Sequence, residues 1–182
     1  MTLKRHDRPG KIAFPLLAVV ILTLLAVANN VALAAPALDR VMSLLQGYEW
    51  RDRSEGFLAL GEDTDQVLMD IAANPQWHAV IRFRALGALR YFPNDKVARF
   101  LESFIAQDLT SDYLRRSLDA FAAAFGQDQP ARVAQLAEPL LQHQDPQIRV
   151  RAAQTLEKLP RGVLSLHVQQ ALDAKIIPDR LQ

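Results

Sequence analysis

Three stretches of similar sequence recur along this chain, and their repetition constrains the fold more than any other feature. They are IRFRALGALRYF (Ile81–Phe92), YLRRSLDAFAAA (Tyr113–Ala124) and IRVRAAQTLEKL (Ile148–Leu159), so they begin 32 and then 35 residues apart. A period of this length is typical of arrays of helix pairs, in which one pair buries its apolar side only against the next. The repetition therefore predicts stacked helix pairs.

Residue size recurs in register within these stretches. Two aligned columns hold small residues, namely Ala85, Ser117 and Ala152, and then Ala88, Ala120 and Thr155. A third column is large and apolar, with Leu89, Phe121 and Leu156. A small residue lets a neighbouring helix approach, and a large residue beside it fills the remaining space. The columns therefore predict the side of each helix that packs against its neighbours.

Capping residues and prolines divide the rest of the chain into helices. Asn94-Asp95 and Thr110-Ser111 are expected to start helices, and Pro130 and Pro146 suit the first helical turn, where the missing N–H is harmless. Ala and Leu are abundant, and such residues favour helices. We predict an all-α protein, an α-solenoid of about three helix hairpins over residues 63–160. Residues 35–62 are expected to cap one end, and residues 161–182 form a C-terminal capping helix and tail.

The last stretch resembles a HEAT repeat. It runs from Asp145-Pro146 through Ile148 and Arg151-Ala152-Ala153 to Leu156, with Asp-Pro opening the second helix of the pair. The first stretch departs from this pattern, since His78 stands where the last has Asp145. The resemblance implies HEAT-like hairpins and a protein-binding scaffold. A few relatives of such repeats are phycobilin lyases or DNA glycosylases, but no residues here support either activity.

Two further columns are candidates for binding. Helical steps of about 100° place Arg84, Arg116 and Arg151 on the flank that looks toward the next repeat. We interpret them as a structural ladder of hydrogen bonds between repeats, with ligand contact as the alternative. Phe83, Arg115 and Val150 share the outward phase, with Gly87, Asp119 and Gln154 beside them. Outward apolar residues in register can mark an interface, so we predict that these three bind a partner, unless a capping segment covers them.

The sequence offers no recognisable catalytic centre. There is no Cys, and His78, His143 and His167 have no metal-ligand spacing. No nucleophile elbow or phosphate-binding loop is present, and Asp63 and Asp65 are interpreted as solvated caps at a helix start. Gly87 lies inside a predicted helix, where it permits close packing or a partner's approach. We therefore predict a protein that is not an enzyme and that uses no metal and no cofactor.

The N-terminus has the pattern of a secretory signal peptide over residues 1–34. Lys4, Arg5, Arg8 and Lys11 precede an uncharged run over residues 12–28, and Ala32, Ala34 and Ala35 surround an A-x-A cleavage site. Cleavage would remove four basic residues and one acidic residue, changing the net charge from +1 to −2. This balance argues against nucleic-acid binding. An uncleaved anchor is the alternative, because the apolar run is near the lower limit for a membrane span.

These features together predict an exported scaffold. The protein is expected in the bacterial periplasm, or anchored in the inner membrane and facing the periplasm, where it binds an unidentified protein partner on the row of second helices. The alternative is an accessory subunit of a membrane-associated enzyme complex, held by the uncleaved N-terminal segment.

Overall fold

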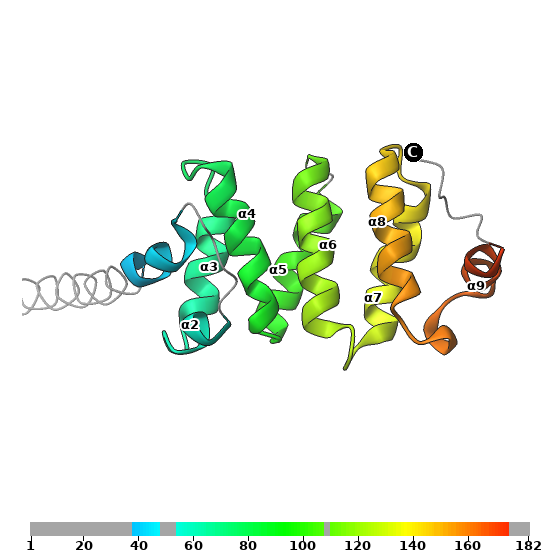
Figure 1. The fold of residues 1–182 in the computed structure, drawn as a ribbon, viewed down its shortest axis with the longest axis horizontal. Coiled ribbons are helices and arrows are strands. Elements are labelled where there is room, and N and C mark those ends of the chain that lie inside the picture. Colours follow the sequence, from blue (N-terminus) through cyan, green and yellow to red (C-terminus); the bar gives the residue numbers. More distant parts are fainter. Residues whose placement is uncertain (1–37, 48–53, 108–109, 175–182) are drawn as a thin grey trace, which may run out of the picture. The chain divides into compact units, whose positions relative to one another are not determined.

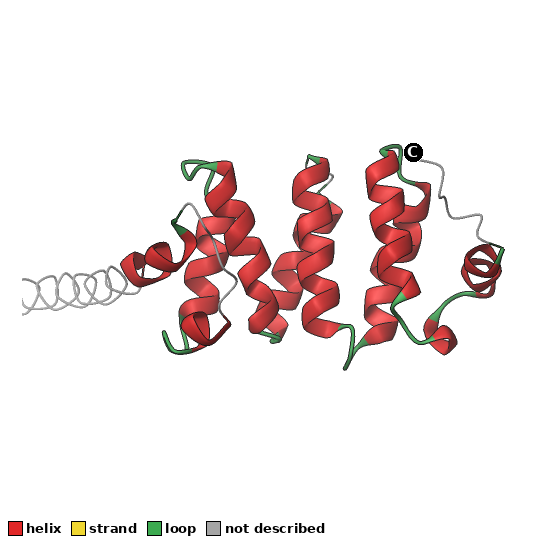
Figure 2. Ribbon diagram, viewed as in Figure 1, coloured by secondary structure: helices red, strands yellow, loops and turns green. Residues whose placement is uncertain are grey.

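A computed structural model describes residues 38–47, 54–107 and 110–174, and every regular element within these ranges is helical (Figure 2). The chain divides into residues 1–39 and residues 40–182, and the helices below belong to the second unit. The predicted signal peptide, including Ala32, Ala34 and Ala35, lies outside the described residues. None of the described helices is long and apolar enough to span a membrane. The prediction of an all-α protein is therefore confirmed for the described residues.

Six of the helices form three consecutive pairs (Figure 1). The pairs are α3 (Thr64–Ala73) with α4 (Ala79–Ala88), α5 (Asp95–Ala106) with α6 (Ser111–Phe125), and α7 (Pro130–Ala137) with α8 (Pro146–Glu157). Helix α4 also packs against α6, and α6 against α8. We call α4, α6 and α8 the second-helix row. The shorter elements are α2 (Ser54–Leu58), α9 (Leu166–Asp173) and the 3-10 turns η1 (Leu89–Tyr91), η2 (Glu138–Gln142) and η3 (Arg161–Val163).

Local capping explains where these helices begin. The side chain of Asn94 accepts a hydrogen bond from the Val97 amide at 3.0 Å, and that of Asp145 accepts one from Gln147 at 2.8 Å. Each bond satisfies an amide that the first helical turn leaves without a backbone partner. Pro130 and Pro146 occupy the first positions of α7 and α8, where no N–H is needed. Thr110 precedes α6 but makes no side-chain capping bond.

The core lies where the repeated columns place it. Both small columns and the large apolar column are buried at every position: Ala85, Ser117 and Ala152, then Ala88, Ala120 and Thr155, then Leu89, Phe121 and Leu156. The small residues allow α4, α6 and α8 to pack side by side, and the large residues fill the space between them and the first helix of each pair. Packing of successive helices, more than propensity, stabilises this arrangement.

Polar contacts connect the first helices of successive pairs. Asp65 on α3 has a buried carboxylate, whose Oδ2 accepts a hydrogen bond from Asn94 Nδ2 at 2.8 Å. Lys96 Nζ lies 3.5 Å from the same oxygen. On the next pair, Arg132 Nε on α7 lies 2.6 Å from Glu102 Oε1 on α5. The interpretation of Asp65 as a solvated cap is therefore wrong, because its carboxylate is enclosed between two helix pairs.

Candidate binding groove on the second-helix row

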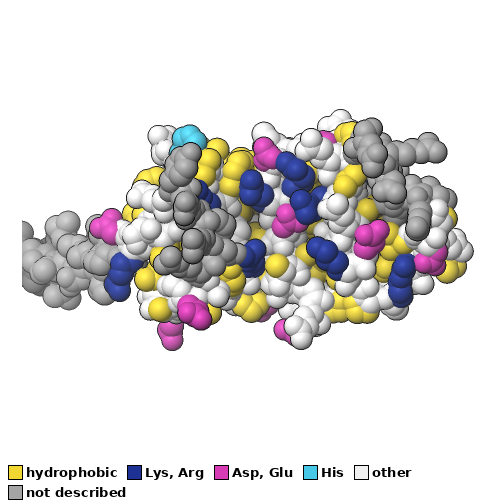
Figure 3. Space-filling model, in the orientation of Figure 1, with side chains coloured by type: hydrophobic (Ala, Val, Ile, Leu, Met, Phe, Trp, Pro, Cys, Tyr) yellow, Lys and Arg dark blue, Asp and Glu magenta, His cyan; other side chains and the backbone are white. Residues whose placement is uncertain are grey.

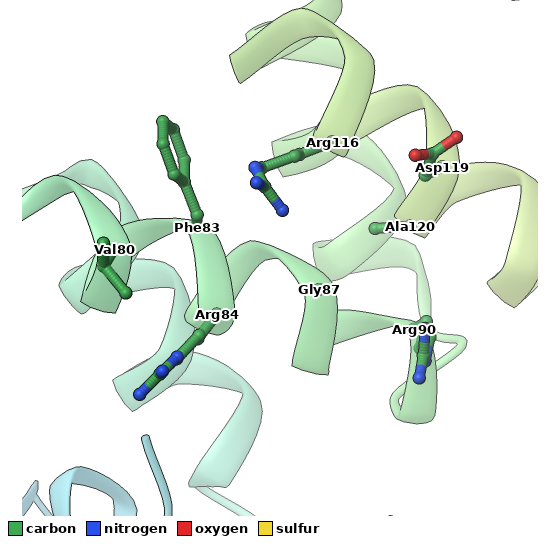
Figure 4. Close-up of a pocket in the computed structure, with 8 residues that line it drawn as sticks. All are labelled: Val80, Phe83, Arg84, Gly87, Arg90, Arg116, Asp119 and Ala120. Carbon is green, nitrogen blue, oxygen red and sulfur yellow. The ribbon is translucent and has the colours of Figure 1, made fainter. Parts of the chain in front are cut away.

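Two neighbouring cavities open on the second-helix row. The first, of about 300 Å³, lies between α4 and α6 (Figure 4). The second, of about 530 Å³, lies between α6 and α8. Arg90 and Asp119 line both cavities, so we treat the two as one groove. The lining of the first cavity also includes Val80, Phe83, Arg84, Gly87, Arg116 and Ala120, and that of the second includes Arg151, Thr155 and Lys158.

The groove is strongly cationic for a chain of this composition. Its lining holds five basic side chains (Arg84, Arg90, Arg116, Arg151 and Lys158) and one acidic side chain, Asp119, whereas the whole chain has a net charge of only +1. Figure 3 shows basic side chains gathered over α4, α6 and α8 with acidic side chains among them. A hollow lined by one sign of charge focuses the electrostatic field and attracts groups of the opposite sign.

An arginine and an aromatic ring join α4 to α6 at this groove. The guanidinium of Arg116 lies 4.6 Å from the centre of the Phe83 ring, and the two side chains lie next to each other in Figure 4. Tyr113 packs edge-on against Phe83, with the two ring centres 4.7 Å apart. Such a cation–π contact holds a guanidinium beside the ring. Its in-plane N–H groups stay available for hydrogen bonds.

The three predicted ladder arginines each contact the part of the chain that precedes their own pair, and not the next repeat, toward which the helical phase was expected to direct them. Arg84 Nη1 donates to the carbonyl oxygens of Leu45 at 2.7 Å and Gly47 at 3.0 Å. Arg116 stacks on Phe83 of α4. Arg151 Nε on α8 lies 3.5 Å from Asp119 Oδ1 on α6. The contacts differ in kind, since Arg84 makes hydrogen bonds, Arg116 a cation–π contact and Arg151 an ion pair.

Asp119 lies where the two cavities meet. Burial raises the pKa of its carboxyl above the ordinary range, and the positive charges of Arg151, Lys158, Arg115 and Arg116 oppose this shift. Desolvation disfavours the charged form of an acid, while nearby cations favour it. As one acidic side chain against five basic side chains in the groove lining, Asp119 can neutralise only part of the positive charge there.

Gly87 forms part of the groove without being required by the packing of the fold. Apart from its chain neighbours and the backbone of its own helix, a Cβ atom placed there would meet no atom within 4 Å, and the residue does not adopt a positive φ. By contrast, Gly47 and Gly61 have φ of 124° and 103°, values that favour glycine. A glycine inside a helix costs about 1 kcal/mol relative to alanine. The structure thus gives Gly87 no packing role and leaves open space above it in the groove.

The predicted partner-binding residues have different environments. Phe83 lines the groove, but it is half-buried and in contact with Tyr113 and Arg116. Arg115 forms an ion pair with Asp112 on its own helix, and its Nε is buried. Arg115 and Val150 are not among the described residues that line either cavity. The structure therefore brings Phe83 together with Arg116, and not with Arg115 and Val150.

Some lining residues were not identified from the sequence. Val80 lines the first cavity and is 44% exposed. Arg90 and Lys158 also line the groove, near the C-terminal ends of α4 and α8. Val80 precedes the repeated stretch, Arg90 belongs to the 3-10 turn that follows α4, and Lys158 follows the end of α8. Neither basic residue recurs in the aligned stretches, since Arg90 aligns with Ala122 and Glu157, so the repetition gave no signal for them.

The histidines and acids do not form a reactive centre in the described part of the chain. His78 Nδ1 accepts from the Val80 amide, His143 Nδ1 accepts from the Asp145 amide, and His167 Nδ1 lies 3.0 Å from Ser165 Oγ. His78 and His143 lie in the turns that precede α4 and α8, and His167 lies in the first turn of α9. The described residues include no cluster of three or more potential metal ligands. What the groove offers chemically is cationic hydrogen-bond donors beside apolar surface.

Comparisons with known proteins give no relative. No family model matches this chain, and neither a curated protein nor a solved structure matches it.

Proposed function

We propose that this chain is a HEAT-like α-solenoid that binds a partner protein in the groove of the second-helix row, without catalysing a reaction. The observation that carries this proposal is the groove itself, which extends along α4, α6 and α8 and combines aromatic, apolar and arginine side chains. Arginine and aromatic residues are the residue types that contribute most to protein–protein affinity.

The stacking of the helix pairs supports the solenoid. Each second helix packs on the next, and an arginine from the same sequence column of each pair contacts the preceding part of the chain (Arg84, Arg116 and Arg151). The first helices are connected in the same direction, through Asp65 with Asn94 and Glu102 with Arg132. In a repeat array, each unit contacts only the units next to it.

We also propose that the protein is exported, on the basis of the signal-peptide pattern over residues 1–34. The intact mass of the protein from its native host distinguishes two arrangements. A chain that begins near Ala35 supports release into the periplasm, and one that begins at Met1 or Thr2 supports a membrane anchor. The retained segment would favour an accessory subunit of a membrane-associated complex.

Photo-crosslinking in the native host tests the binding face. A photoreactive amino acid is placed at Ala123 on α6 or Gln154 on α8, both exposed on the second-helix row, and at Arg99 on α5 or Gln135 on α7 as exposed controls. The proposal predicts a discrete adduct with a partner protein from positions 123 and 154 only. Adducts confined to positions 99 and 135 would place the binding face on the first helices and refute the proposal.

A further inference from the structure

We propose that the groove takes an acidic segment of the partner, with a carboxylate bound by Arg116 and an apolar side chain in the open space above Gly87. This inference rests on the proposed function and adds the chemistry of the ligand. Three features of the groove support it: the unused donors of Arg116, the second cationic position formed by Arg151 and Lys158, and the open space beside Gly87.

Arg116 is held beside Phe83 by a cation–π contact. Its guanidinium stacks on Phe83, and among the described residues no group accepts a hydrogen bond from it and no carboxylate lies within 4 Å. A guanidinium has five in-plane donors, in a geometry that matches a carboxylate. Because the stacking already restricts this side chain, binding a carboxylate costs it little additional conformational entropy.

A second carboxylate position lies further along the groove. Arg151 is paired with Asp119 at 3.5 Å, and the side chain of Arg151 is 37% exposed. Lys158 lines the same cavity, is exposed, and has no carboxylate within 4 Å among the described residues. Asp119 is the one acidic side chain in a groove lining that holds five basic side chains, so the charge of the groove favours further carboxylates.

The space above Gly87 fits an apolar side chain. Val80, Phe83 and Ala120 line the same cavity, and a Cβ at position 87 would touch nothing within 4 Å. Burial of an apolar side chain on this surface would contribute affinity in addition to the ionic contacts. A nucleic acid would meet the same cations, but the central Asp119 and the apolar wall make an acidic peptide the better match.

Selection of peptides tests the proposal. A library of random displayed peptides is panned on the purified full-length chain, and the affinities of the selected peptides are then measured by fluorescence anisotropy. The proposal predicts selection of peptides enriched in Asp and Glu around an apolar residue. Arg116→Glu is expected to weaken their binding by at least about tenfold, the equivalent of one lost charge-assisted contact. Arg99→Glu, an exposed arginine on α5 with no carboxylate within 4 Å in the described part of the chain, is the matched control and should have no such effect.

A second pair of variants tests the apolar position. Gly87→Leu fills the open space and is expected to weaken peptide binding by about tenfold or more, while thermal unfolding shows that the fold is retained. Ala131→Leu, at an exposed position on α7, should leave binding unchanged.

The outcomes separate this inference from the proposed function. If the selected peptides show no acidic enrichment but Gly87→Leu still blocks their binding, the acidic ligand would be overturned and the groove would remain the binding site. Peptides that are insensitive to both Arg116→Glu and Gly87→Leu would overturn the site as well. Failure to select any peptide, or binding of a single-stranded oligonucleotide that Arg116→Glu abolishes, would overturn the acidic-peptide proposal.

Discussion

Substitution of two glycines by alanine should change stability in opposite directions. Gly87 lies in α4 with nothing within 4 Å of an added Cβ, so Gly87→Ala removes the entropic cost of glycine without introducing a clash. Helix propensities give a gain of about 0.5–1 kcal/mol in the free energy of unfolding. For a chain of this size, that gain corresponds to a rise of roughly 1–4 °C in Tm.

Gly126 is the matched control, because both glycines lie at the C-terminal end of a second helix: Gly126 caps α6, and Gly87 is in the last turn of α4. An added Cβ there would lie 2.5 Å from the carbonyl oxygen of Ala122, a backbone atom that cannot move away cheaply. Gly126→Ala is therefore expected to destabilise the fold by roughly 1–3 kcal/mol. Circular dichroism at increasing temperature and urea denaturation measure both variants. A lower Tm for Gly87→Ala, or an unchanged one for Gly126→Ala, would refute this account of the two sites.

Three further substitutions test the contacts that connect the helix pairs. Asn94→Ala removes a helix cap and a donor to the buried carboxylate of Asp65. Urea denaturation should therefore show a free energy of unfolding lower by about 2 kcal/mol, and an unchanged midpoint would contradict the contact. Arg132→Ala removes the half-exposed ion pair with Glu102 and should cost about 0.5–1 kcal/mol by the same assay, whereas a stabilised variant would argue against it. Burial raises the pKa of Asp119, so this group favours folding below its unfolded pKa and loses that contribution as pH rises through its raised folded pKa. The free energy of unfolding of Asp119→Asn, relative to that of the parent protein, should therefore rise as the pH is raised from 3 to 7. A fall over that range would refute the direction of the pKa shift.

The helix starts and the core were predictable because their signals are local. Asn94 and Asp145 cap the expected helices, and Pro146 occupies the first position of α8. The small and large columns predicted the buried side of each second helix, since burial follows helical periodicity. Contacts between non-consecutive helices carry no such periodic signal, so the enclosure of Asp65 was not predicted.

The site was predicted only in part for the same reason. Helical phase placed Phe83 and Asp119 toward the outside and Arg116 on the flank, but phase does not state which side chains meet across two helices. The stacking of Arg116 on Phe83 depends on the separation of α4 and α6. Lys158 was missed because it lies after the last turn of α8. Gly87 was recognised as unusual from sequence, and the structure adds that the space above it is open.

The central claim is that the second-helix row binds a partner protein through its cationic groove. The most direct test is affinity purification of the tagged full-length chain from its native host after mild cross-linking, with the parent protein, Arg116→Glu and Arg99→Glu compared side by side. The account predicts one discrete partner that copurifies with the parent protein and with Arg99→Glu, and that is lost from Arg116→Glu while the fold is retained. A partner that copurifies equally with all three proteins would contradict the claim.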